Sequence, residues 1–362
     1  MIDFTHRELN CCIRSFRVII QKLFILLLLS IVSQQLQAGK ADTLFLSDDI
    51  LKVELRSDFT AIQKDRSEEP VYHEGELIYR TGNGDHVKLS VRVMVRGNFR
   101  RDPKHCEFPP LYVNFRKSEV KNTIFDNQNR IKLVTHCQSR EDLIEEYMVY
   151  KMYNQVTKRS MKARMARIIY YDTKADSVLF TNYSFFIEDK DKVAERNNSK
   201  ETLKFMTPFS LDKESYMKLT FFQYMIGNRD WYVSSRKNID LMQPDDTSQA
   251  PYAIPYDFDF CGMIDADYTK PQGVPKEKLS ERRIYKGICY SEGELNEVFD
   301  FYRRLRPAFV SIIKSQKYLS AYTRRQDIRY IGYFYKVIGD KNLLSKEFLE
   351  RCETRKDYNI PE

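Results

Sequence analysis

Tryptophan, histidine, glycine and proline are all scarce in this chain of 362 residues, which contains one Trp, five His, 12 Gly and 12 Pro. So little Gly and Pro excludes a collagen-like or linker-rich chain. The scarcity of His, with no Ser-His-Asp or Cys-His pattern, disfavours a hydrolase that uses an activated nucleophile. Charged residues of both signs are interspersed and never form blocks, so the net charge of +8 does not indicate a nucleic-acid partner, and we expect none.

Aromatic residues, in contrast, are abundant. The chain has 23 Phe and 24 Tyr, and 42% of its residues are hydrophobic. This composition is typical of a globular protein with an aromatic core. The length suggests two domains of roughly 150 residues each, or one two-lobed unit.

The N-terminus has the pattern of an export signal. Arg14, Arg17 and Lys22 precede an apolar run, 23–32, and the small residue Ala38 follows a short polar stretch. The run is short for a hydrocarbon core of roughly 30 Å, so we expect cleavage after residue 38 and no permanent membrane span; an uncleaved anchor is the alternative. The mature protein would then be exported, and either periplasmic, envelope-associated or secreted.

Export would place the remaining cysteines in an oxidising compartment. Five of them follow the signal: Cys106, Cys137, Cys261, Cys289 and Cys352. An odd number permits two disulfides and leaves one thiol. We expect a Cys106–Cys137 disulfide, with unpaired core thiols as one alternative. Zinc is another, because a His precedes each of these two residues, but the spacing does not match the usual ligand patterns.

The first half of the chain reads mainly as strands. Hydrophobic residues alternate along 51–55 and 89–95, and 81–85 is typical of a hairpin turn. Ser139 and Asp142 resemble the start of a helix that runs to about Val156. Strands are expected at 131–134, 167–171 and 178–187.

Helices are expected to dominate after a polar stretch at 189–204. One apolar helical face ends at Gly227, another covers 295–305, and helices continue over 317–354. We therefore predict an α+β fold of two lobes. After the signal peptide, 1–38, a β-rich N-lobe with one helix covers 39–190, and a helical C-lobe covers 191–362.

Carboxylates gather in two polar loops of the second half. Asp230 and Asn238 lie in the loop that follows the predicted helix, and Asp257 and Asp259 follow an apolar extended segment, 252–254. An extended backbone would aim Asp257 and Asp259 at the same face, which suits Mg²⁺. Asp230 would orient or deprotonate an attacking hydroxyl, and Asn238 would complete the metal shell. The alternative is that these residues only cap loops, as Asp often does.

These loops, together with Arg96-Gly-Asn98 and Phe186-Ile-Glu188, resemble the CotH family of spore-coat-H kinase-like proteins, and more closely a group of uncharacterised exported bacterial proteins allied to it. The resemblance extends from about Leu44 to Cys289. It implies an atypical protein-kinase-like fold that binds ATP with Mg²⁺ or Mn²⁺ between a β-rich lobe and a helical lobe.

The resemblance also implies roles for individual residues. Asp230 would be the catalytic aspartate, with Asn238, Asp257 and nearby Asp259 at the metal. Lys132 would hold phosphate and form an ion pair with Glu146, and Arg96 would also contact phosphate.

Two features depart from ordinary kinases. Asp230 and Asn238 are eight positions apart, where ordinary kinases have five, so the loop would have to bulge. No Gly-rich phosphate loop is present. Two hypotheses therefore remain: a metal-dependent phosphotransferase acting on an exported protein or glycan, and a non-catalytic envelope or secreted binding protein with a kinase-like shell.

Overall fold

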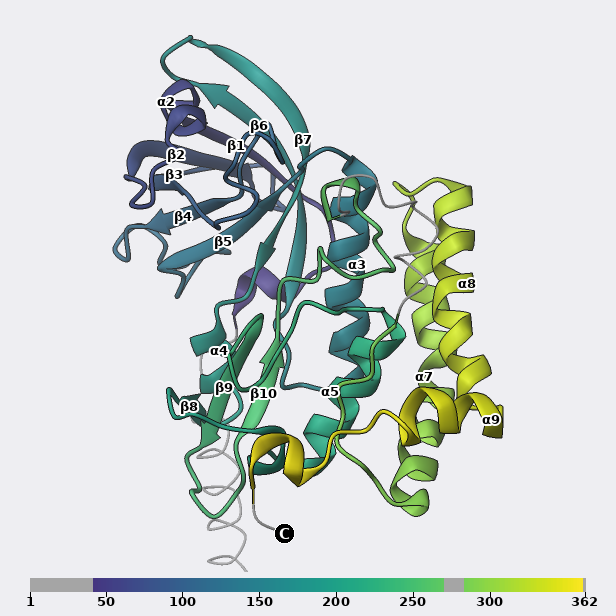
Figure 1. Cartoon of the computed structure of the whole chain (residues 1–362). Helices are drawn as coiled ribbons and strands as arrows, with labels where there is room; N and C mark the ends of the chain where they lie inside the picture. The colour runs from purple at the N-terminus through teal and green to yellow at the C-terminus, as the bar shows by residue number, and fades with distance from the viewer. Residues whose placement is uncertain (1–41, 270–282, 361–362) are drawn as a thin grey trace, which may run out of the picture. The chain divides into compact units, whose positions relative to one another are not determined.

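The computed structural model describes residues 42–269 and 283–360, so the expected signal peptide lies outside the described residues. From Thr43 onward the chain forms one compact unit, in which a β-rich region precedes a region of helices (Figure 1). This confirms the expected mixture of strands and helices. Within the described ranges, no helix combines the length and apolar character needed to cross a bilayer.

Seven strands close into a barrel in the first half of the chain. They are β1 (Leu51–Ser57), β2 (His73–Arg80), β3 (His86–Val95), β4 (Leu111–Phe115), β5 (Arg130–Thr135), β6 (Ala163–Asp172) and β7 (Ser177–Ile187). Their order around the barrel is β1-β2-β3-β4-β5-β7-β6. The parallel pairing of β1 with β6 closes it, and the other pairs are antiparallel. The expected β-rich region is therefore a closed seven-stranded barrel, which differs from the typical N-lobe of a protein kinase.

The barrel has its own hydrophobic core. Alternate residues of β1, Leu51, Val53 and Leu55, are buried in it, as the sequence pattern predicted. The short helix α2 (Phe59–Lys64) adds Phe59, whose ring meets that of Tyr170 edge-on at 5.4 Å. The expected hairpin turn at 81–85 joins β2 to β3.

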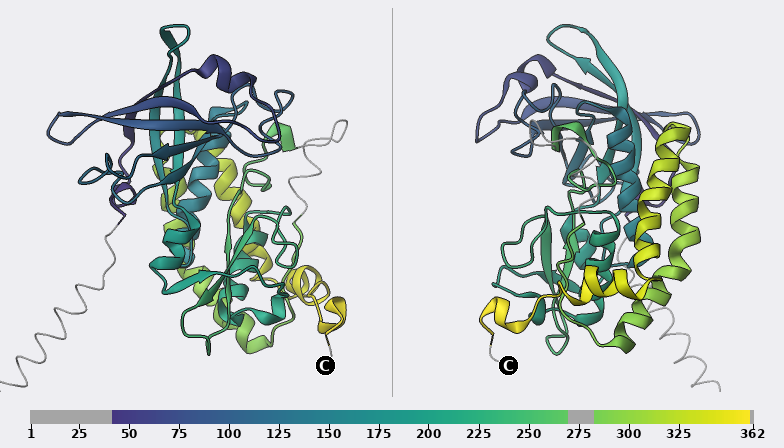
Figure 2. Two further views of the ribbon diagram at one scale, coloured as in Figure 1. Left: turned by 90° about the vertical axis from the view of Figure 1, so that its left-hand side faces the viewer. Right: turned by 45° about the vertical axis from the view of Figure 1, so that its right-hand side comes forward.

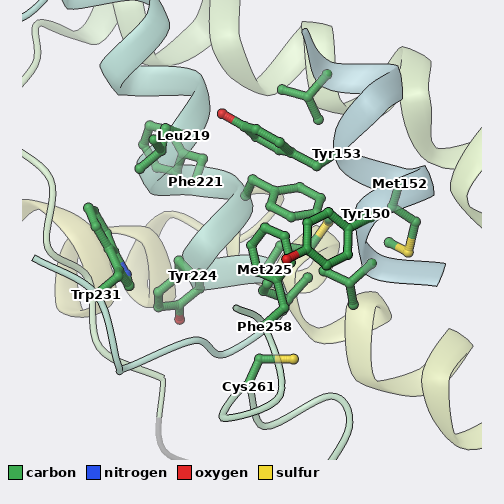
Figure 3. Packing of buried hydrophobic residues seen from close by; sticks show 14 of the residues in the cluster. Tyr150, Met152, Tyr153, Leu219, Phe221, Tyr224, Met225, Trp231, Phe258 and Cys261 are labelled. Carbon is green, nitrogen blue, oxygen red and sulfur yellow. The ribbon is translucent and has the colours of Figure 1, made fainter. Parts of the chain in front are cut away.

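Helix α3 (Arg140–Val156) lies between β5 and β6 in the chain. Its N-cap is Ser139, whose Oγ accepts from the backbone N–H groups of Glu141 and Asp142, which confirms the predicted start. The buried face of α3 belongs to a second hydrophobic core, shared with the later helices. Figure 3 shows Tyr150 and Tyr153 of α3 beside Phe258, in the loop that carries the predicted metal site.

The second half is mainly helical, as expected. Its helices are α4 (Lys190–Glu195), α5 (Lys213–Met225), α7 (Glu292–Ser315), α8 (Ala321–Val337) and α9 (Lys341–Leu344), followed by a π-helical turn, Ser345–Leu349. It also holds a three-stranded sheet of order β10-β9-β8. These strands are β8 (Ser199–Glu201), β9 (Ile239–Pro244) and β10 (Tyr252–Pro255); only β10 was expected from the sequence. Helices α7 and α8 lie next to α3 (Figures 1 and 2).

Two disulfides cross-link the chain. Cys106 is bonded to Cys137, as predicted, which rules out the zinc and free-thiol alternatives for this pair. Cys289 is bonded to Cys352, and Cys261 is a buried free thiol. The expected pattern of two bridges and one remaining thiol is therefore confirmed.

Candidate functional site

The two polar loops singled out in the sequence lie side by side. Backbone hydrogen bonds join Gly262 N–H to Gly227 C=O and Met263 N–H to Ile226 C=O, both at 3.1 Å. A further bond runs from Tyr256 N–H to the carbonyl of Asn238, also at 3.1 Å. Asn238 is therefore bonded to the residue directly before Asp257.

Asp230 and Asn238 form a hydrogen-bonded pair. The side-chain nitrogen of Asn238 donates to the backbone carbonyl of Asp230 at 2.7 Å and to its carboxylate at 3.1 Å. Both bonds use the nitrogen, so the amide oxygen is the atom left for a cation. The carboxylate of Asp230 also forms an ion pair with Lys237.

The extra residues between Asp230 and Asn238 form a small hairpin. Tyr232 and Lys237 exchange two backbone hydrogen bonds of 3.0 Å, and the turn between them places Arg236 at φ 53°. The bulge that we expected from the eight positions between Asp230 and Asn238 is therefore present. It brings the Asn238 side chain back into contact with Asp230.

Lys286 holds the Asp230 loop in place through hydrogen bonds to its backbone. Its ammonium, 6% exposed, donates to the carbonyls of Arg229 at 2.5 Å and Trp231 at 3.0 Å, the two neighbours of Asp230. It also lies 3.6 Å from the centre of the Tyr232 ring. Burial lowers the pKa of Lys286 to about 8, although Asp230 opposes the shift. The sequence analysis missed this lysine because it lies 55 residues beyond Trp231 in the chain.

Asp257 and Asp259 lie in a turn and not in the extended segment that we expected. Asp257 has φ 60°, in the left-handed region, so the backbone is not extended there, and a turn begins at Asp259. Its N–H donates to the Tyr150 hydroxyl at 2.9 Å. The two carboxyls still interact: burial first, and then the charge of Asp257, raise the pKa of Asp259. Tyr268 donates to Asp259 at 3.2 Å.

Glu146 forms its ion pair with Arg100 and not with Lys132, which corrects the prediction. The Arg100 guanidinium lies 3.4 Å from the Glu146 carboxylate, and both side chains are buried. Arg100 also donates to the carbonyl of Thr135 at the end of β5. Burial raises the pKa of Glu146 to about 7, against the opposing effect of Arg100.

Arg100 is the central cation of this cluster. Burial by itself would lower its pKa, but Tyr268, Glu146, Asp259 and Asp257 together raise it. Arg100 lies two residues after the Arg96-Gly-Asn98 motif, and an arginine beside a turn is usually exposed. Its tertiary partners, which no local pattern reveals, are what bury it.

Lys132 and Arg96 lie close together without an ion-pair partner among the described residues. Burial and then the charge of Arg96 lower the pKa of Lys132, while Asp240 and Asp257 act in the opposite direction. Lys132 Nζ lies 4.7 Å from the centre of the Tyr256 ring. Arg96 lies over Tyr112, and its Nε has no hydrogen-bond partner. Two adjacent cations without a carboxylate of their own are suited to an anionic ligand.

The structure offers only a few ligands for the expected metal ion. Within the described ranges, no group of three or more His, Cys, Asp or Glu side chains is arranged to hold a metal ion. Mg²⁺, however, is commonly held by only one or two carboxylates, with water and substrate phosphates completing its shell. The oxygens of Asp257, Asp259 and Asn238 therefore fit a cation that arrives with a nucleotide better than one bound by the protein alone.

Comparison with known proteins identifies no family. No protein-family model matches the chain, and no curated protein matches it. Among solved structures it is similar to the Helicobacter pylori proinflammatory kinase CtkA, with 11% identity and a TM-score of 0.37 over 67% of this chain and 92% of that one. A likeness of this degree supports no inference about function.

Proposed function

We propose that this protein is an atypical kinase-like phosphotransferase that uses ATP and Mg²⁺ or Mn²⁺ to modify an exported protein or glycan. The observation that carries the proposal is charge complementarity. Lys132 and Arg96 have no ion-pair partner among the described residues. The charge of Asp257 opposes the lowering of the Lys132 pKa, and the same carboxyl group raises the pKa of Asp259 and Glu146. A nucleotide phosphate bound with a divalent cation would satisfy both sets of charges.

Each residue then has a defined role. Lys132 and Arg96 hold phosphate oxygens, and Arg100 with Glu146 keeps the buried wall of the site in place. Asp257, Asp259 and Asn238 supply oxygen ligands to the cation, which when bound neutralises charge on the transferred phosphoryl group. Asp230 accepts the proton of the acceptor hydroxyl, and Lys286 and Asn238 hold its loop.

The test is nucleotide binding by the purified protein with and without Mg²⁺. Asp257→Asn should weaken the Mg²⁺-dependent part of ATP binding by roughly tenfold or more, because a charge-assisted contact is worth about 1.5–3 kcal/mol. Asn is chosen because it tolerates the left-handed conformation of Asp257, whereas Ala would add backbone strain. Calorimetric titration of ATP measures the effect.

Asp176→Asn is a matched control, because Asp176 also has a left-handed backbone, φ 49°, but lies in the exposed β6–β7 turn. It should bind as the wild type does. Wild-type protein that shows no nucleotide binding would refute the proposed function, and equal Mg²⁺-dependent binding by wild type and Asp257→Asn would refute the metal site.

The second candidate, a non-catalytic exported binding protein, is favoured by one observation. Asp230 is already bonded to Lys237 and Asn238, as a residue that only fixes its loop would be. Phosphoryl transfer separates the two candidates. If Asp230→Asn leaves ATP affinity unchanged but abolishes turnover of bound ATP, the phosphotransferase is supported. If the wild type binds ATP and never turns it over, the non-catalytic binding protein is supported.

A further inference from the structure

A buried pair of carboxyl groups links two helices away from the Asp230 loop. Glu145 of α3 is 4% exposed and Asp327 of α8 is 1% exposed, and their side chains are hydrogen-bonded to each other. No Lys or Arg within the described ranges forms an ion pair with either of them. Because an ionised carboxylate can only accept hydrogen bonds, this contact requires a proton on one of the two groups. Without that proton, Asp327 Oδ2 has no donor in the part of the chain that the structure describes.

A second connection joins the same two helices. One turn earlier on α3, Glu141 accepts hydrogen bonds from Ser320 N–H, at 2.6 Å, and from the Thr323 hydroxyl, at the start of α8. Glu145 follows Glu141 by four residues and Asp327 follows Thr323 by four, so the two connections are spaced by about one turn on each helix. Figure 2 shows α8 running beside α3.

A cavity of about 1060 Å³ borders both connections. Its wall includes Glu141, Glu145 and Asp327 together with Tyr330, and Gly262 from the segment that follows Asp259. Space beside a buried contact lets the contact separate and hydrate without unfolding the surrounding core.

The charges around the pair are predominantly negative. Several titratable groups face the pair or line the same cavity. They are Glu141 and Asp142 of α3; Cys261, Asp265 and Asp267 of the loop after Asp259; Arg283, which precedes α7; and Tyr322, Arg329, Tyr330 and Tyr333 of α8. Arg283 lies over the rings of Tyr330 and Tyr333. Burial first, and then Asp327, raise the pKa of Glu145, and burial raises the pKa of Asp327 to about 7.

We propose that Glu145 and Asp327 form a pH-sensitive latch that holds α8 against α3 while they share a proton and releases it when both are ionised. The released proton goes to solvent, and two buried carboxylates then repel each other. Glu145 is followed directly by Glu146, the partner of Arg100, so release would reach the candidate site through α3. The latch is independent of the proposed phosphotransferase activity.

The direction of the pH effect follows from the raised pKa values. A carboxyl whose pKa is higher in the folded protein stabilises the fold at low pH and loses that contribution as the pH rises through the folded value. Asp327 ionises near pH 7, while Glu145, whose pKa burial and Asp327 raise well above its usual range, keeps the shared proton. The latch is therefore closed in mildly acidic solution and opens above pH 7, when Glu145 ionises as well.

Urea unfolding of the full chain between pH 5 and pH 8 tests the proposal, together with hydrogen-exchange protection of α8. In wild type, we expect the unfolding equilibrium constant to increase by up to tenfold per pH unit, the value for one proton, and α8 to lose protection above pH 7. In Asp327→Asn and Glu145→Gln, an amide supplies the donor permanently, so the pH dependence of α8 protection should disappear. The part of the unfolding pH dependence that comes from other carboxyls with raised pKa values, such as Glu146, should remain.

Thr323→Val is the control, because it removes one of the two hydrogen bonds that α8 donates to Glu141 without changing any titratable group. It should lower α8 protection to a similar degree at pH 5 and pH 8. If Asp327→Asn and wild type show the same pH dependence, the latch is refuted. If neither amide variant folds, the wild type alone decides: α8 protection that stays constant from pH 5 to pH 8 overturns the proposal.

Discussion

Arg100 shows how a single side chain can organise a site. Its guanidinium is enclosed by Glu146 of α3, the Thr135 carbonyl of β5 and the ring of Tyr268, so it joins the barrel to the helical region and to the loop after Asp259. A buried charge of this kind is costly unless it is paired, and removing its partner leaves the remaining charge without compensation.

Arg100→Met should therefore destabilise the protein by about 3–5 kcal/mol at pH 8.5, where Glu146 would be left as a buried carboxylate. At pH 5.5 the cost should be smaller, because Glu146, whose pKa is about 7 even beside Arg100, can then take up a proton. Urea unfolding at the two pH values measures the difference.

Arg101→Met is the adjacent control, since Arg101 forms no ion pair in the described structure; we expect a change within about 0.5 kcal/mol. Equal destabilisation by Arg100→Met at both pH values would show that its charge does not compensate Glu146.

At the scale of elements, the junction between α5 and the Asp230 loop depends on Gly227. This residue has φ 66° and ends the helix, and its carbonyl accepts from Gly262 in the neighbouring loop. A Cβ at this position would lie 2.0 Å from the Tyr330 hydroxyl of α8. The end of the helix and the packing against α8 therefore both require a glycine here.

Gly227→Ala should destabilise the protein by about 1–3 kcal/mol, through backbone strain and displacement of Tyr330. Gly332→Ala provides the contrast, because Gly332 lies inside α8 and a Cβ there has no atom within 4 Å. That substitution should stabilise by about 0.5–1 kcal/mol. Thermal unfolding compares the two variants, and a neutral Gly227→Ala would contradict the account of the junction.

At the scale of the whole molecule, the two disulfides tie together segments that are far apart in sequence. The Cys106–Cys137 bond spans 31 residues beside β4 and β5, and the Cys289–Cys352 bond spans 63 residues and encloses α7 and α8. The second bond lies close to Lys286, so it also helps to hold the residue that fixes the Asp230 loop.

Mass spectrometry of the unreduced protein should find two linked peptide pairs, Cys106 with Cys137 and Cys289 with Cys352. Cys261 should react with alkylating agents only after unfolding, because burial excludes the reagent and raises the pKa of its thiol. Replacing Cys106 and Cys137 by Ser should cost about 2–4 kcal/mol. Free Cys106 and Cys137 in the native, oxidised protein would contradict the pairing.

Much of the local structure was predictable. The alternation in β1, the N-cap at Ser139 and the helix ending at Gly227 are patterns of neighbouring residues, and all three were confirmed. Strand β9 and the closure of the barrel were not predicted, since both depend on pairing between distant segments. The site was foreseen in part: the two loops meet as expected, but the ion-pair partner of Glu146 was assigned to the wrong cation.

The sequence by itself determined most of the barrel strands, the longer helices and the two loops that carry the carboxylates, because these properties depend on residue types at short spacing. Only the tertiary structure decided which charges are buried and which partners they have. Arg100 with Glu146, Lys286 with the Asp230 loop, and Glu145 with Asp327 come from distant parts of the chain. Their energies depend on desolvation and on distances of a few ångströms, which exist only once the chain is packed.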